Sequence, residues 1–365
     1  MIVPKELITE RQGLAMMVLF IIGSTLVVGV SDAAKQDNWL SVILAMIMAL
    51  PILMLYARLI HLFPGKDLYT IIHQVLGPIA GKAISLLFVW YAFHVGALVI
   101  RNFSEFLSEI ALTETPQYFI QLVFVLLCIW AVKGGIEVLG RWTSFVFNIL
   151  LVVAIGLILM SLSKINFANF TPILDKGFRP VIDGAFSVFS FPLAETVVFI
   201  SILSFLKPGA SSYKVYNLSL LIGGCIILFS VFRNIAVLGF PFLSTQYFPS
   251  YITVSLIDFG EFFRRFEVLA AVVFLLCGFV KVSICLFCTA TGIARIFNVT
   301  DYRIMTAPVA FLMINLAIVI YPNMQEMFEW MKVYKYYAIP FQVLLPLILW
   351  IGAEAKARFT KNQYS

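Results

Sequence analysis

The chain has 365 residues, of which 62% are hydrophobic and only 12% are charged. Soluble globular domains carry about 25% charged residues, so the composition excludes that class and predicts one all-α integral membrane domain over residues 1–365. The net charge of +6 follows from Lys and Arg in the segments expected on the cytoplasmic side. A nucleic-acid partner is therefore not needed to explain it.

Ten apolar segments are long enough to cross a bilayer, for which a helix needs about 20 residues. In chain order they are 12–31, 39–62, 83–110, 117–133, 142–162, 181–205, 215–240, 266–293, 303–321 and 336–353. Basic residues are in excess on the side of the N-terminus, which predicts that both termini are cytoplasmic. We expect no cleavable signal peptide, because the first apolar segment has full spanning length and no small-residue cleavage site follows it.

The first segment has three weak helix formers near its middle, Gly23, Ser24 and Thr25, and then Gly29. A break in the helix is one interpretation. The other is that glycine is simply common in membrane helices.

The third segment carries Arg101, Glu105 and Glu109 on one helical stripe near its outer end. This spacing predicts a local ion pair. His94, in the same segment, is either a proton relay or a hydrogen-bonded core residue.

Three connections are longer than a turn. Residues 63–82 begin with a Pro-Gly turn and continue as a short amphipathic stretch, expected at the cytoplasmic surface. Residues 163–180 form a predicted outer loop. Residues 250–265 predict an outer amphipathic helix, a lid or a docking surface, in which Ile252, Leu256 and Phe259 face away from Asp258, Glu261 and Arg265.

The sixth segment contains Pro192 and Glu195 at membrane depth. Proline removes a backbone donor and clashes with the preceding turn, and a carboxylate at the centre of a span costs about 2.5–3.5 kcal/mol on insertion scales. Lipid compensates neither defect, whereas a protein interior or a water-lined cavity does. Broken helices at this depth hold small solutes in carriers, so the sixth segment is the predicted site.

Breakers thus occur in two segments that lie five helices apart. Their positions predict a five-plus-five inverted repeat, with repeats at about 12–162 and 181–353. No sequence identity between the two halves supports this interpretation, which rests on position alone.

Lys281 lies near the middle of the eighth segment, too deep to reach either surface. A buried ammonium needs a partner, and Glu195 is a candidate. In a fold of this kind the amine could also stand in for a bound sodium ion. The cysteines (Cys128, Cys225, Cys277, Cys285 and Cys288) all lie in apolar segments, where they are expected as buried thiols without disulfides.

No enzyme signature is present. The three histidines, His61, His73 and His94, lack metal-ligand spacing, and no glycine-rich phosphate loop follows a strand. We therefore expect no catalytic residues, no metal and no cofactor.

Four features together resemble the B subunits of spore-germination nutrient receptors, a branch of the amino acid–polyamine–organocation transporter superfamily. They are the length with ten spans, Phe63-Pro64-Gly65, the run Phe189-Ser190-Phe191-Pro192 leading to Glu195, and the outer segment from Phe248-Pro249-Ser250 to Gly260-Glu261-Phe262-Phe263-Arg264-Arg265-Phe266-Glu267. The likeness extends over most of the chain.

The resemblance implies a LeuT-like fold with broken first and sixth helices. It also implies a location in the inner membrane of the bacterial spore, with an A subunit and a lipoprotein C subunit as partners and a small nutrient, typically an amino acid, as ligand. The family pocket lies among the first, third, sixth and eighth helices, which maps it onto Gly23, Ser24, Thr25, Tyr91, Val95, Phe191, Pro192, Glu195 and Thr289. Thr289 is alternatively a core hydroxyl bonded to its own helix. Candidates for ion or proton coupling are Glu195, Lys281 and His94.

Two functions remain open at this point. The favoured one is a nutrient-sensing receptor subunit that binds its ligand at the membrane midplane and signals to partner subunits to start germination. The alternative is a proton-coupled amino acid secondary transporter, because a receptor can keep a transporter's fold and pocket.

Overall fold

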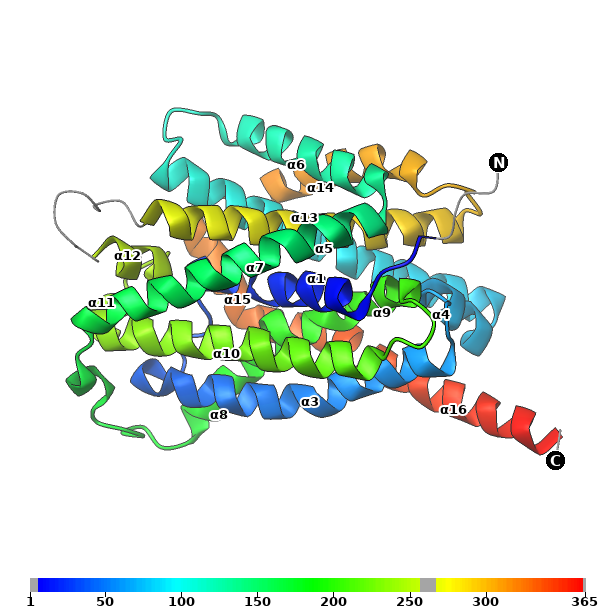
Figure 1. Ribbon diagram of the computed structural model, residues 1–365, viewed down its shortest axis with the longest axis horizontal. Coiled ribbons are helices and arrows are strands. Elements are labelled where there is room, and N and C mark those ends of the chain that lie inside the picture. The colour runs from blue at the N-terminus through cyan, green and yellow to red at the C-terminus, as the bar shows by residue number, and fades with distance from the viewer. Residues whose placement is uncertain (1–5, 257–266, 364–365) are drawn as a thin grey trace.

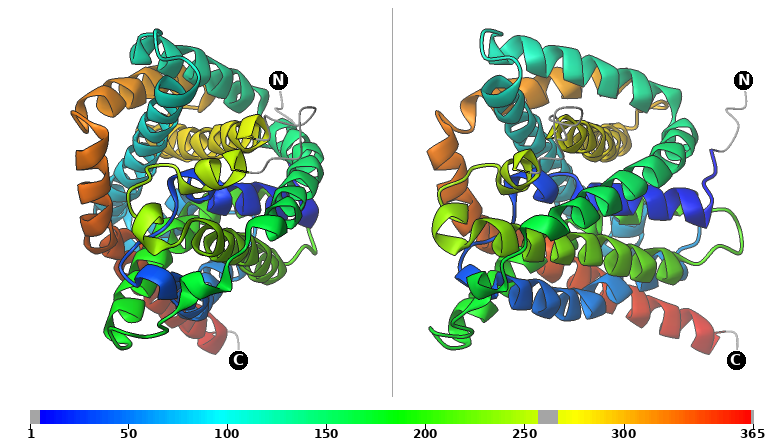
Figure 2. Two further views of the ribbon diagram at one scale, coloured as in Figure 1. Left: turned by 90° about the vertical axis from the view of Figure 1, so that its left-hand side faces the viewer. Right: turned by 60° about the vertical axis from the view of Figure 1, so that its left-hand side comes forward.

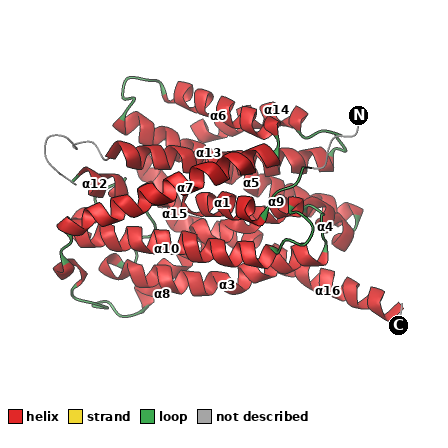
Figure 3. Ribbon diagram, in the orientation of Figure 1, coloured by secondary structure: helices red, strands yellow, loops and turns green. Residues whose placement is uncertain are grey.

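The computed structural model describes residues 6–256 and 267–363, and helices run through almost all of this part of the chain (Figure 3). The α-helices are α1 (Glu10–Ile22), α2 (Thr25–Val28), α3 (Asn38–Leu62), α4 (Leu68–Leu76), α5 (Pro78–Ile110), α6 (Gln117–Gly134), α7 (Ile136–Met160), α8 (Arg179–Val188), α9 (Phe199–Ile202), α10 (Ser212–Leu238), α11 (Phe240–Leu243), α12 (Pro249–Ser255), α13 (Glu267–Ile296), α14 (Arg303–Val319), α15 (Met324–Ile339) and α16 (Leu345–Gln363). Short 3-10 turns are η1 (Lys35–Asp37), η2 (Ser161–Lys164), η3 (Phe167–Phe170), η5 (Ala194–Val198) and η6 (Leu203–Phe205). The turn η4 (Phe189–Leu193) contains a kink at Phe191, and η7 (Pro340–Leu344) is a π-helical turn.

Eight helical stretches of the described residues are at least 18 residues long and apolar enough to cross a membrane. The shorter helix α14 has 17 residues, and the first predicted span is divided into α1 and α2 at Gly23 and Ser24. The sixth span runs from α8 through η4, η5 and α9 to η6. Breaks are therefore present in both spans where the sequence predicts them.

The helices form one bundle, and different parts of the chain lie at its two ends (Figure 1). Both chain termini lie at one end, here called the termini end, and α11 and α12 lie at the other, here called the loop end. Helix α1 runs through the interior of the bundle (Figure 2), and residues 15–22 are at most 2% exposed. A helix that is apolar all round is stable only when it is enclosed, which places the first span at the centre.

The tenth span differs most from its prediction. The sequence predicts a helix over 336–353, whereas the helical stretch begins at Met324 and continues through η7 into α16. Helix α15 carries Glu326, Glu329, Lys332 and Lys335, and in the sequence these charges are typical of an outer loop. Lys335 is in fact 5% exposed and pairs with Asp183 of α8.

The smaller elements follow the predictions in part. Helix α4 lies in the 63–82 connection and buries its apolar face against α5 and α16. The predicted ion pair of the third span is present, with Arg101 and Glu105 2.5 Å apart. Helix α12 covers the start of the predicted outer amphipathic segment, whereas Phe259, Asp258, Glu261 and Arg265 lie outside the described residues.

The termini end is closed by the segment that precedes α1. The backbone of Ile8 pairs with the end of the sixth span, donating to the Phe205 carbonyl (2.8 Å) and accepting from the Lys207 amide (2.9 Å). Glu6 forms an ion pair with Arg303, at the start of α14, with 2.5 Å between Oε1 and the guanidinium. These contacts hold residues 6–9 across the base of the bundle.

Candidate functional site

The break in the sixth span exposes backbone groups inside the bundle. Phe191 has φ −133° and ψ 111°, outside the helical range, and the buried Pro192 follows it. Carbonyls that lose their intrahelical partners need other donors at this depth. Gln342 Nε2 supplies one to the Ser190 carbonyl at 2.7 Å.

A buried ion pair joins the sixth and eighth spans beside this break. Lys281 Nζ of α13 lies 2.6 Å from Glu195 Oε2, and the two side chains are 0% and 3% exposed. The rings of Phe20 and Phe191 flank the ammonium, with centroids at 4.8 and 4.9 Å. The pairing predicted from two isolated charges is therefore present, and aromatic faces add further cation–π stabilisation.

Glu195 has a second partner that the sequence did not reveal. Tyr334 of α15 donates its hydroxyl to Glu195 Oε1 at 2.6 Å, and this hydroxyl lies 3.1 Å from that of Tyr91 in α5. Both tyrosines are buried. Each carboxylate oxygen thus accepts one charge-assisted hydrogen bond, which fixes the plane of the carboxyl group.

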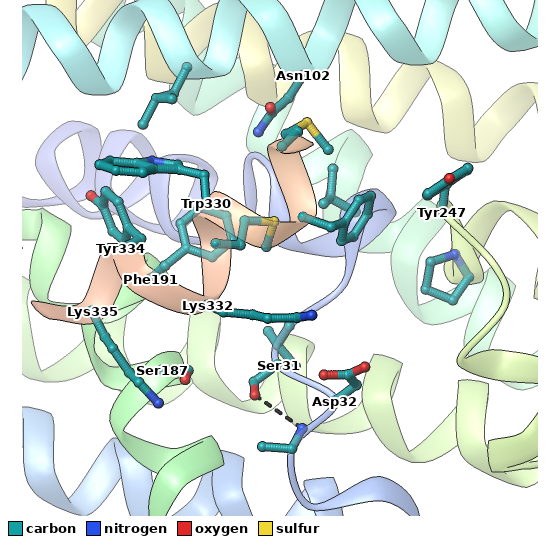
Figure 4. Close-up of a pocket in the computed structure, with 18 of the residues that line it drawn as sticks. Ser31, Asp32, Asn102, Ser187, Phe191, Tyr247, Trp330, Lys332, Tyr334 and Lys335 are labelled. Carbon is teal, nitrogen blue, oxygen red and sulfur yellow. Dashed lines mark hydrogen bonds between the residues drawn. The ribbon is translucent and has the colours of Figure 1, made fainter. Parts of the chain in front are cut away.

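A cavity of about 560 Å³ extends from Glu195 to the loop end of the bundle. The close-up view shows Phe191, Trp330 and Tyr334 grouped on one side, with Lys332 crossing toward Ser31 and Asp32 (Figure 4). The tenth span contributes many of the lining residues: Met327, Phe328, Trp330, Met331, Lys332, Tyr334, Lys335 and Tyr336. No described residue of α13 lines it. The cavity is bounded by the first, third, sixth and tenth spans and, at the loop end, by residues 243–247 and Pro249.

The predicted first-span residues surround the helix break and do not line this cavity. A Cβ added to Gly23 would meet the Cys277 carbonyl at 3.2 Å and Lys281 Cδ at 3.3 Å, so glycine permits the close approach of α1 to α13. Ser24 is buried, and its Oγ has no partner among the described residues. Thr25 donates to the carbonyl one turn before it at 3.3 Å.

The other predicted ligand contacts divide into two groups. Val95, Phe191 and Glu195 line the cavity, whereas Tyr91 reaches it only through the hydroxyl network. Thr289 lies outside the lining, and its hydroxyl donates to the carbonyl of the preceding turn at 2.8 Å. This is the arrangement of a core hydroxyl bonded to its own helix.

His94 lies in an aromatic cluster beside the cavity. It stacks on Trp90 (5.6 Å between ring centroids) and meets Tyr337 (5.0 Å) and Trp330 (5.9 Å) edge-on. Its Nδ1 has no hydrogen-bond partner among the described residues. The histidine is thus separated from Glu195 by aromatic side chains.

Comparison with known proteins identifies the family. A family model described as "Spore germination protein" matches residues 7–327. The chain belongs to this family. It is 30% identical over 359 residues to spore germination protein KB of Bacillus subtilis (strain 168), covering 97% of this chain and 96% of that protein. Spore germination protein XB of Bacillus anthracis is 23% identical over 93% of this chain and 97% of its own.

Solved structures establish the fold of this spore germination protein as LeuT-like. Mhp1, a nucleobase-cation-symport-1 family transporter in a closed conformation with bromovinylhydantoin bound, matches with a TM-score of 0.67 at 13% identity, over 95% of this chain and 78% of that one. MhsT in complex with L-phenylalanine matches with a TM-score of 0.68 at 15% identity, over 95% and 89%. The family member is thus an integral membrane protein on a transporter fold.

Proposed function

We propose that the chain is the nutrient-binding B subunit of a spore germinant receptor. In this proposal it lies in the inner membrane of the spore with both termini cytoplasmic, beside an A subunit and a lipoprotein C subunit. The observation that carries it is the cavity of about 560 Å³ above the buried Glu195–Lys281 pair. Family membership supports the role in germination.

The ligand is a small amino-acid-like nutrient bound at the membrane midplane. Val95, Phe191 and the tenth-span residues Trp330 and Met331 offer apolar contacts, and Glu195 lies at the cavity floor. A nutrient that binds one conformer better shifts the population toward it, and contacts with the partner subunits pass this shift on. The signal is then a coupling between two sites and needs no net transport.

Lys281 carries the ion part of the proposal. Its ammonium is enclosed by Glu195, Phe20 and Phe191 and supplies a fixed positive charge between the first, sixth and eighth spans. A site that already holds a cation of its own needs no bound sodium to balance Glu195. We therefore expect nutrient binding to be independent of Na⁺.

The test is nutrient binding and uptake with the chain alone in proteoliposomes, using a panel of radiolabelled L-amino acids with and without Na⁺ and a proton gradient. Saturable binding without gradient-driven uptake supports the receptor. The Glu195→Gln variant should insert normally and bind at least about tenfold more weakly, because a charge-assisted pair at the floor is lost. Glu105→Gln, which breaks an ion pair outside the cavity, is the matched control and should bind normally.

A proton-coupled amino acid transporter is the second candidate. The likeness of the whole chain to two transporters favours it. Concentrative uptake driven by the proton gradient in the same vesicles, without A and C subunits, would establish this alternative and contradict the receptor proposal.

A further inference from the structure

Irregular turns of two spans meet in the interior of the bundle. One is η4 in the sixth span, which is kinked at Phe191 and contains Pro192, and the other is the π-helical turn η7 in the tenth span, which begins at Pro340. Single π turns inside helices occur often at functional sites. Gln342 lies in η7, is 0% exposed and joins the two turns.

Gln342 supplies a hydrogen-bond donor to a backbone carbonyl at the break of the sixth span. Its Nε2 donates to the Ser190 carbonyl at 2.7 Å and to the Tyr91 hydroxyl at 2.7 Å. The backbone carbonyl of Gln342 accepts from the Tyr56 hydroxyl of α3 at 2.5 Å. One residue therefore connects the third, sixth and tenth spans with the second, which carries Tyr56.

The chemistry of these partners requires an amide donor at this position. A backbone carbonyl only accepts, so the Nε2 group must face Ser190. The Oε1 of Gln342 has no partner among the described residues, which means that the position uses both donors of the amide and not its acceptor. An apolar side chain of the same size would leave the Ser190 carbonyl buried without a donor.

The hydrogen bonds continue from Gln342 to the cavity floor. Tyr91 contacts Tyr334, and Tyr334 donates to Glu195. Tyr334 and Gln342 lie in the same span on either side of the junction between α15 and η7. One chain of hydrogen bonds therefore holds α15 in place relative to Glu195, through Tyr334 at one end and Gln342 at the other.

We propose that Gln342 is a positioning residue that clamps the break of the tenth span onto that of the sixth. The clamp holds Tyr334 against Glu195, so that a ligand-dependent movement at the cavity floor is transmitted to the tenth span. This inference rests on the proposed nutrient-binding function and adds the element that reads out the ligand.

The experiment uses spores that carry the complete receptor and an equimolar mixture of the twenty L-amino acids as the probe. Gln342→Leu removes two buried hydrogen bonds and leaves the Ser190 carbonyl without this donor. It should raise the half-maximal dose at least about tenfold, while the maximal germination rate and the receptor abundance stay at wild type. Tyr91→Phe removes one hydroxyl of the same chain and should raise the half-maximal dose in the same direction. The double variant should shift it no further than the larger single shift, because residues of one network are not additive.

The matched control is Gln121→Leu. Gln121 is 1% exposed and donates to Ser104 Oγ at 2.9 Å, outside the cavity lining. This variant tests whether the loss of any buried side-chain amide shifts the half-maximal dose. We expect its half-maximal dose to equal that of the wild type.

Three outcomes overturn the inference: a wild-type dose in Gln342→Leu, an equal shift in Gln121→Leu, or additive shifts in the double variant. If Gln342→Leu lowers receptor abundance, the test rests on Tyr91→Phe alone. A wild-type half-maximal dose in Tyr91→Phe then overturns the clamp. Wild-type receptor that ignores the mixture contradicts the proposed function, and the clamp with it. Normal binding to the wild type together with unaltered variants contradicts the clamp alone.

Discussion

The two ends of the bundle are built in opposite ways. At the loop end, a cavity extends between α8, α15 and the segment 243–247 down to Glu195. At the termini end, the segment before α1 pairs with the end of the sixth span, and Glu6 bridges Arg303 and the backbone amide of Ile136 (2.7 Å). In the part of the chain that the structure describes, the bundle is therefore open at the loop end and closed at the termini end.

The two candidate functions make different demands on these two ends. A transporter has to open the termini end in every cycle, which breaks the Ile8 backbone pairing and the Glu6 contacts. A sensor has only to move the floor against α15.

The largest effect is expected at the boundary between these two ends, where Lys281 neutralises Glu195. Replacing Lys281 by Met leaves an uncompensated buried carboxylate, and breaking such a pair costs about 3–5 kcal/mol. We expect the variant to lose most of its thermal stability in detergent and all nutrient response.

The double variant Lys281→Met with Glu195→Gln provides the control. Removing both charges restores a neutral interior, so stability should return toward wild type while nutrient response stays lost. Equal stability of the single and double variants would show that the pair does not hold the two spans together.

The next effect concerns the closed end. Glu6→Ala removes two hydrogen bonds of a charged group, worth about 1.5–3 kcal/mol for such bonds. The amide of Lys207, which donates to Ile8, should then exchange with deuterium at least about tenfold faster in native-state measurements.

Glu329→Gln is the matched control, away from this end. Glu329 pairs with Lys332 one turn away on the same helix and is more exposed than Glu6, and exposed pairs of this kind contribute little. If the exchange rate of the Lys207 amide is unchanged in Glu6→Ala, or rises equally in the control, the Glu6 contacts do not hold the termini end closed.

The open end offers a test of which helix selects the nutrient. Met331 of α15 lines the cavity and Thr289 of α13 does not. Met331→Ala should enlarge the cavity and shift the ratio of half-maximal doses for L-alanine and L-phenylalanine about tenfold toward the larger ligand, a size typical of pocket changes by a few methylene groups. Thr289→Val keeps the shape and should leave the ratio within about threefold; the reverse pattern would return specificity to the eighth span.

The break of the sixth span and the partner of its carboxylate, Lys281, were predictable from sequence because each depends on the chemistry of single residues. Pro192 and Glu195 are defects wherever a membrane helix carries them, and Lys281 was an isolated charge at similar depth. Tyr334 and Gln342 were missed because their roles depend on helix packing. The charges of residues 326–335 also concealed a helix whose polar face turns to a cavity, although the spacing of Met327, Trp330, Met331 and Tyr334 is that of one helical face.

His94 gives the smallest expected effect and separates packing from proton transfer. Sequence left it open as a relay or a core residue, and it packs against Trp90, Trp330 and Tyr337 outside the cavity lining. A group outside the cavity lining that packs on aromatic rings is not placed to pass a proton to Glu195. His94→Gln should therefore change the half-maximal dose by less than about threefold, the range of a lost ring contact. The measurement is the dose curve at several pH values between 5 and 8, where histidine ordinarily titrates. A variant that loses the pH dependence of the wild type would make His94 the proton carrier and would favour a coupled transporter over a sensor.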